Sequence, residues 1–223
     1  MNPPVPVLAI DGPGGAGKGT VSRAVARHLG WHFLDSGAIY RALAIAVIDR
    51  TIAPDAVADI VKIAHAMQLR FDTAEPPGVC LDGVDISDRL QDEQTGAIAS
   101  RIAALGSVRQ ALLQKQRDFR QLPGLVADGR DMGSVVFPDA EWKVFLTASV
   151  EIRAERRYRQ LKRKGLDVNL EELRSELEIR DRRDRERAEA PLIQSPGSVL
   201  IDTSELDIPT AIQQCLAVVR PLA

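Results

Sequence analysis

Cysteine is scarce in this 223-residue chain, which has only Cys80 and Cys215. Because no Cys or His clusters beside either of them, the sequence encodes neither a disulfide framework nor a zinc site, and a reducing compartment fits. Long hydrophobic runs are scarce too. The run from Val7 to Ile10 is far too short for a signal-peptide core or a membrane span. We therefore expect a cytoplasmic protein with no membrane partner.

Aromatic residues are few, with two Trp, two Tyr and five Phe. A protein that binds single-stranded RNA needs aromatic side chains for base stacking, and only Tyr158 lies in the most basic stretch. An ATP-binding regulatory or RNA-binding protein is therefore a minor alternative, and we expect no nucleic-acid partner. Asparagine occurs only at positions 2 and 169, so the Asn-Lys-x-Asp string of guanine recognition is absent and we do not expect a GTPase switch.

Apolar residues make up 45% and charged residues 27% of the chain, which is typical of a globular protein with a substantial core. Strand patterns alternate with helix patterns: strands at 5–10, 32–34, 125–127, 142–147 and 199–201, and helices at 18–29, 38–49, 107–121 and 170–187. This alternation predicts an α/β fold with a parallel sheet and helices on both faces. Apolar residues flanking Asp82-Gly83 predict a β-hairpin. The hairpin interrupts the alternation, so we assign residues 63 to 95 to an inserted subdomain.

A glycine loop lies between the first predicted strand and the first predicted helix. It has the context and composition of a phosphate-binding loop, since glycine N–H groups, a helix N-terminus and Lys18 all attract a triphosphate. The same stretch spells Gly12-x-Gly14-x-x-Gly17, and Asp35 lies where a dinucleotide fold places its ribose-binding acid, so a dinucleotide-binding oxidoreductase is the alternative. Lys18 and Thr20 are expected only in a triphosphate site and favour that interpretation. The loop residues are Gly12, Pro13, Gly14, Gly15, Ala16, Gly17, Lys18, Gly19 and Thr20.

Arginine dominates the predicted acceptor side. A phosphate acceptor is already largely dianionic at neutral pH and needs no base, whereas guanidinium groups neutralise and align two polyanions. The stretch 151–190 holds many of the basic residues. Mixed charge at helical spacing is typical of solvated helices with i,i+4 ion pairs. The Arg-rich ends of this stretch fit an anion-binding site better. Asp128, at the end of a predicted strand, is a candidate Mg²⁺ ligand through water or a simple turn cap.

Four strings resemble the bacterial cytidylate kinases, a family of ATP-dependent nucleoside monophosphate kinases with a P-loop. They are LAIDGPGGAGKGT at 8–20, LDSGAIYRALA from 34, LVADGRDMGSVVFPDA from 125 and RDRRDRERAEAPL from 180. The form Gly-Lys-Gly-Thr also fits monophosphate kinases. The resemblance covers the chain essentially end to end and implies one P-loop kinase domain, 1–223, that transfers the γ-phosphoryl group of ATP to CMP and dCMP, with Mg²⁺, as a monomer.

The resemblance also implies a role for each matching residue. The catalytic cations would be Lys18, Arg130 and Arg187. The CMP phosphate would be held by Arg41, Arg130 and Arg187, bordered by Ser36 and Tyr40. Arg180 and Asp184 would contact the ribose, and Ser100, Arg109 and Asp131 the cytosine. Residues 63–95 would be the monophosphate-binding insert, and a lid at 153–167 would bring Arg156 onto ATP and close over the transferring group.

Overall fold

The computed structural model describes residues 5–71 and 78–219. The chain divides into two compact units, each treated separately below. The core unit comprises Met1–Leu34 and Arg117–Ala223, and the insert unit comprises Asp35–Gln116. Along the described chain, no helix combines the length and the apolarity needed to cross a bilayer.

The core unit is built on a five-stranded sheet in the order β2-β6-β1-β7-β8. Its strands are β2 (His32–Asp35), β6 (Leu125–Gly129), β1 (Val7–Asp11), β7 (Trp142–Thr147) and β8 (Val199–Asp202). β1 pairs in parallel with β6 and β7, and β7 pairs in parallel with β8. Because parallel strands end at the same sheet edge, the segments that follow β1, β6 and β7 come together there.

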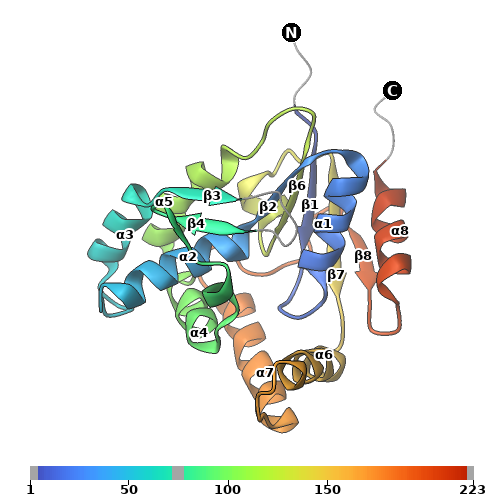
Figure 1. Cartoon of the computed structure of the whole chain (residues 1–223). Helices are drawn as coiled ribbons and strands as arrows, with labels where there is room; N and C mark the ends of the chain where they lie inside the picture. Colours follow the sequence, from blue (N-terminus) through green and yellow to red (C-terminus); the bar gives the residue numbers. More distant parts are fainter. Residues whose placement is uncertain (1–4, 72–77, 220–223) are drawn as a thin grey trace. The chain divides into compact units, whose positions relative to one another are not determined.

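Two helices cover one face of the core sheet. α1 (Lys18–Leu29) and α8 (Ile208–Val218) pack side by side against it, as Figure 1 shows. Val25 of α1 and Cys215 of α8 are buried in one cluster with Leu8, Ile10 and Val144 of the strands. Since side chains alternate along a strand, Val7, Ala9 and Asp11 point to the opposite face. That face carries a π-helical turn, η2 (Met132–Val136), whose amide groups bind Asp11.

A helical hairpin follows β7 in the core unit. It consists of α6 (Val150–Arg163) and α7 (Leu170–Glu186), which lie against each other in Figure 1. Ser149 caps α6 through its hydroxyl, and Asn169 caps α7 by accepting from two backbone N–H groups. The hairpin carries the exposed i,i+4 pairs Arg159–Glu155 and Arg174–Glu178, so the solvated-helix interpretation is confirmed for these outer faces.

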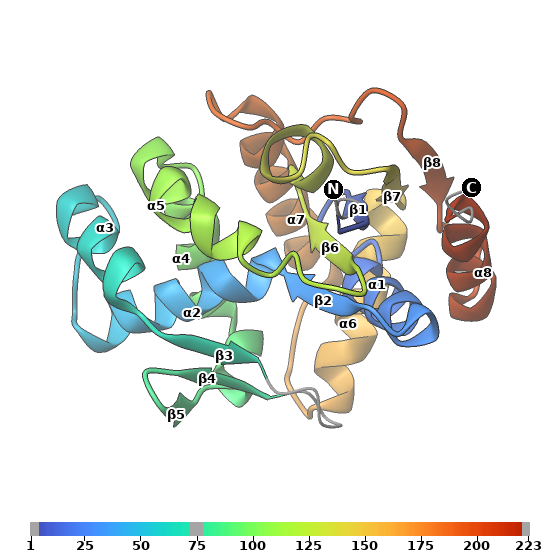
Figure 2. The ribbon, with the colours of Figure 1, turned by 90° about the horizontal axis from the view of Figure 1, so that it is seen from above.

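The insert unit combines helices with a three-stranded antiparallel sheet, β3-β4-β5, visible in Figure 2. Asp82 and Gly83, both with positive φ, form the predicted hairpin turn. The unit extends beyond residues 63–95 on both sides. Its elements are α2 (Ser36–Asp49), α3 (Val57–Ala66), β3 (Leu69–Phe71), β4 (Val79–Leu81), β5 (Val84–Asp85), η1 (Asp88–Gln91), α4 (Glu93–Ile102) and α5 (Gly106–Arg117).

The fold class and most element boundaries predicted from the sequence are confirmed. α1 begins and ends where predicted, and β7 does too. The predicted helix 107–121 is too long, because α5 ends at Arg117 and the chain turns before Pro123 and Gly124. α3, α4 and η2 were not predicted.

Gly124, directly before β6, generates a test of the core packing. A Cβ atom there would lie 2.4 Å from the ring of Trp31. We expect Gly124→Ala to lower the free energy of unfolding by about 1 to 3 kcal/mol through overpacking. In a Trp31→Leu background the same change should cost less than half as much, as urea unfolding of the four proteins would measure. Equal costs in both backgrounds would show that Trp31 is not the obstacle.

Candidate nucleotide site

The glycine loop follows β1 and is held close to β7. A Cβ on Gly12 would lie 1.9 Å from the carbonyl oxygen of Leu146, so only glycine fits there. Gly15 and Gly17 have φ values of 80° and 91°, which the absence of a Cβ makes accessible. Among the described side chains, none caps the N-terminus of α1. The first N–H groups of that helix therefore point toward the loop, the arrangement that binds phosphate.

Lys18 turns back over the loop. Its Nζ donates to the carbonyl oxygen of Pro13 at 3.0 Å and lies 3.9 Å from Asp128 Oδ1. The side chain is only 6% exposed. Burial, together with the charge of Arg130, lowers the pKa of Lys18 to about 8, although Asp128 opposes this effect. The ammonium group is thus a buried charge poised beside the loop.

Asp128, near the end of β6, is a buried carboxylate beside the start of α1. Its Oδ2 lies 3.5 Å from the position of a Cβ on Gly19, at the start of α1. The described residues contain no group of three or more His, Cys, Asp or Glu side chains that could hold a metal by themselves. Mg²⁺ in phosphoryl-transfer sites is ordinarily bound by one or two carboxylates plus phosphate oxygens and water. The donor set around Asp128 therefore fits such an ion.

Several arginines gather at the same edge. Arg130 Nε donates to Asp184 Oδ2 at 3.0 Å. A Cβ on Gly14 would lie 3.3 Å from Arg130 and 3.6 Å from the Arg180 guanidinium, so both guanidinium groups lie over the loop. Arg187 donates to the carbonyl oxygen of Ala190 at 2.5 Å. The core unit thus brings Arg130 and Arg180 together with the glycine loop, as the sequence predicted for an anion site.

Asp131 lies next to Arg130 in the sequence but is directed elsewhere. Its Oδ1 is 3.9 Å from Arg187, and both side chains are almost completely buried. This is the pairing expected if Asp131 has only a structural role. It is equally compatible with a carboxylate that a bound base reaches, because a carboxylate has several acceptor positions.

Arg156, which was predicted to contact ATP, is connected to the glycine loop through one residue, Thr203. Its guanidinium donates to the hydroxyl of Thr203 at 3.1 Å and to the carbonyl oxygen of the same residue. The Thr203 hydroxyl lies 3.0 Å from the carbonyl oxygens of Ala16 and Thr147. Thr203 therefore connects the glycine loop, β7 and α6, and the sequence analysis did not identify it.

The remaining predicted site residues belong to the insert unit. Arg41 donates to the Leu90 carbonyl oxygen, and its guanidinium packs against Gly96 of α4. The Arg109 guanidinium lies 5.8 Å from the centre of the Tyr40 ring, a cation–π distance. Ser36 donates to Gln116 Oε1 at 2.6 Å. Ser100 is buried on α4.

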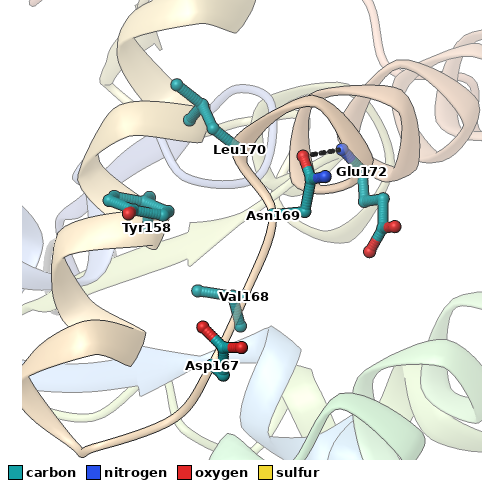
Figure 3. A pocket seen from close by; sticks show the side chains of 6 residues that line it. All are labelled: Tyr158, Asp167, Val168, Asn169, Leu170 and Glu172. Carbon is teal, nitrogen blue, oxygen red and sulfur yellow. Dashed lines mark hydrogen bonds between the residues drawn. The ribbon is translucent and has the colours of Figure 1, made fainter.

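One hollow in the core unit lies away from the glycine loop. It has a volume of about 650 Å³ and lies between the end of α6 and the start of α7, lined by Tyr158, Asp167, Val168, Asn169, Leu170 and Glu172 (Figure 3). Its carboxylates and apolar side chains offer no phosphate-binding group. A second hollow of about 460 Å³ runs along α6 and is lined by Arg156, Arg159, Gln160, Arg163 and Lys164. We place the chemistry at the loop, where the buried charges are.

Asp11 is a buried carboxylate that the sequence analysis missed. It is the last residue of β1, and its two oxygens accept from the N–H groups of Met132 at 2.7 Å and Gly133 at 2.8 Å. The carboxylate therefore fixes the η2 turn that begins directly after Asp131. Burial raises the pKa of Asp11 to about 6, even though the backbone N–H groups favour the ionised form.

The fold and the loop together define a P-loop phosphate-binding protein. A family model described as cytidylate kinase matches residues 8–221. The chain is 56% identical to the cytidylate kinase of Methylococcus capsulatus over 99% of both chains, and 49% identical to that of Klebsiella pneumoniae over 99% of this chain and 97% of the relative. The chain belongs to the cytidylate kinase family.

A solved structure shows a looser similarity. The shikimate kinase of Bacteroides thetaiotaomicron has 15% identity and a TM-score of 0.47 over 96% of this chain and 97% of that chain, too low to add to the assignment. The family match confirms the resemblance of the four strings. It leaves the oxidoreductase and RNA-binding alternatives without support.

The pKa of Asp11 makes stability depend on pH. A raised pKa means that the native state holds the proton more tightly than the unfolded chain. The stability that the protonated carboxyl contributes is therefore complete below pH 3.8, its ordinary pKa, and is lost as the pH rises through about 6. Relative to Asp11→Asn, which does not titrate, the wild-type free energy of unfolding should fall by roughly 2 kcal/mol between pH 4 and pH 6.5.

Denaturant unfolding of both proteins across that pH range measures the difference. Between pH 7 and pH 8 the difference should be constant, which serves as the internal control. A difference that stays flat or grows from pH 4 to pH 6.5 would contradict the burial of an Asp11 proton in the native state.

Proposed function

We propose that this chain transfers the γ-phosphoryl group of ATP to the phosphate of CMP, and also of dCMP, giving the diphosphate and ADP. The observation that carries the proposal is the gathering of Arg130 and Arg180 over a glycine loop that contains Lys18. An acceptor phosphate oxygen attacks the γ-phosphorus while the bond from that phosphorus to the β-bridging oxygen breaks. No base is needed because the acceptor is already largely dianionic.

The cations of the site offset the repulsion that slows this reaction in water. Two polyanions must meet in line, and fixed guanidinium groups offset their repulsion without reorganising during the reaction. In the proposal Lys18 bridges β and γ oxygens, Arg130 and Arg187 hold the acceptor phosphate, and Arg180 and Asp184 bind the ribose. Arg156 closes on ATP as part of the lid at 153–167.

The insert unit supplies the other acceptor contacts in this proposal. Arg41, Ser36 and Tyr40 bind at the CMP phosphate, and Ser100 and Arg109 at cytosine together with Asp131. The cation–π contact between Arg109 and Tyr40 supports this assignment, because it places the proposed cytosine contact, Arg109, beside Tyr40, which borders the proposed phosphate site. Mg²⁺, bound near Asp128 through water, would stabilise charge on the transferred group. We place the enzyme in the cytoplasm as a monomer; the free thiols of Cys80 and Cys215 support a reducing compartment.

A panel of nucleoside monophosphates tests the function directly. With ATP and Mg²⁺, CMP and dCMP should give diphosphate faster than UMP, AMP or GMP, and ATP without an acceptor should be hydrolysed slowly. Lys18→Ala should lower turnover by orders of magnitude, because the charge acts on the transition state, and its circular dichroism spectrum should show that the variant still folds. No diphosphate from any monophosphate, or unchanged turnover in Lys18→Ala, would overturn the proposal.

Base choice is the sharpest test of the site. Cytosine presents an amino donor where uracil presents a carbonyl acceptor, so a carboxylate suits the first and repels the second. Asp131→Ala should lower kcat/KM for CMP far more than for UMP, shrinking their ratio by roughly tenfold or more. Arg41→Ala is the matched control, since Arg41 is another proposed contact of the CMP phosphate and its loss should lower kcat/KM for both substrates by the same factor. The same equal loss in Asp131→Ala would mean that Asp131 acts only through Arg187.

A further inference from the structure

Arg153 is a buried arginine at the start of the predicted lid, 153–167, and the sequence analysis gave it no role of its own. It lies in the first turn of α6 with 3% of its surface exposed. Its guanidinium contacts three segments of the core unit. Nε donates to the carbonyl oxygen of Ala148 at 2.9 Å, NH1 to the carbonyl oxygen of Gly14 at 3.0 Å, and both NH1 and NH2 to the carboxylate of Asp181, at 3.1 and 2.6 Å.

The contact with Gly14 orients a peptide of the glycine loop. The peptide plane is rigid and trans, so its C=O and N–H groups point in opposite directions. Holding the Gly14 carbonyl toward Arg153 therefore directs the N–H of Gly15 to the other side of the loop. The stem of Arg153 adds to this, because its Cβ lies 3.2 Å from the position of a Cβ on Gly15.

The contact with Asp181 orients α7. Asp181 follows Arg180 directly and lies one turn before Asp184. Arg180 lies over Gly14, and Asp184 holds Arg130. The same guanidinium that fixes the glycine loop thus fixes the helix that carries the proposed ribose contacts.

Stability alone does not account for this arrangement. Replacing a buried ion pair by apolar side chains is often neutral or stabilising. The planar fork of arginine, in contrast, can hold a carboxylate and a carbonyl group at fixed angles. Misplacing reacting groups by about 1 Å can cost about a hundredfold in rate.

We propose that Arg153 and Asp181 are positioning residues, which set the glycine loop and the substrate-binding face of α7 in register for phosphoryl transfer. This inference rests on the proposed function for its kinetic consequence. Its structural consequence, the orientation of the loop toward ATP, does not depend on CMP.

The test separates stability from positioning with an apolar double variant. Arg153→Met with Asp181→Leu removes both charges, so the melting temperature should stay within a few degrees of wild type. Its kcat with ATP and CMP should nevertheless fall at least tenfold, and its Kd for ATP, measured by calorimetry, should rise several-fold. A folded double variant with wild-type kcat and wild-type ATP affinity overturns the proposal.

A second variant keeps the test decisive if the double variant does not fold. Arg153→Lys retains the charge beside Asp181, but a single ammonium group cannot hold Ala148, Gly14 and Asp181 at once. It should fold and lose about tenfold in kcat; a folded Arg153→Lys with full activity also overturns the proposal. Arg174→Met is the matched control, because Arg174 also bridges the two helices, to Glu151 at 3.2 Å, but at the surface. It should leave kcat unchanged.

The rate of CDP formation by the wild-type protein separates a failure of the proposed function from a failure of the positioning role. If wild type forms no CDP, the proposed function fails, while ATP affinity of the variants still decides whether Arg153 orients the loop. If wild type forms CDP and the folded variants match it in both readouts, the function stands and the positioning role fails.

Discussion

The concentration of positive charge beside the glycine loop is the constraint on which the rest of the core unit depends. Guanidinium and ammonium groups cannot be buried alone, since an unpaired buried charge costs several kcal/mol. Four of these cations are matched by a carboxylate from another element: Lys18 by Asp128, Arg130 by Asp184, Arg153 by Asp181 and Arg187 by Asp131. These pairs join β6, α6 and α7 to the carboxyl edge of the sheet.

Local signals in the sequence were sufficient for the elements that surround the loop. Gly17 and Gly30 bracket α1, and an Asp-Gly pair between apolar runs specifies the hairpin turn at 82–83, so both could be predicted. α4 could not, because Gly96 lies inside it and disfavours a helix. The side chain of Arg41, packed on Gly96, provides tertiary support that no local pattern contains.

The candidate site was predictable only where its residues lie at a characteristic spacing within a recognisable sequence motif. Lys18, Arg130 and Arg180 were found in this way, and the structure gathers them at one edge. Asp11 and Arg153 escaped because their importance comes from partners 121 and 28 positions away. From the sequence alone, Asp11 is the end of a predicted strand, and Arg153 is one of many charged residues on a predicted solvated helix. Only burial distinguishes them from their neighbours.

The pairing of these four cations with carboxylates has a consequence for how a nucleotide binds. Charges that are already paired project a weaker field into solvent than unpaired ones, so these four cations act on a nucleotide mainly at short range. A phosphate group that binds one of these cations takes the place of the carboxylate that is paired with it. A chain of phosphates that engages several of these cations at once therefore replaces several carboxylate contacts together, which a small inorganic anion cannot do.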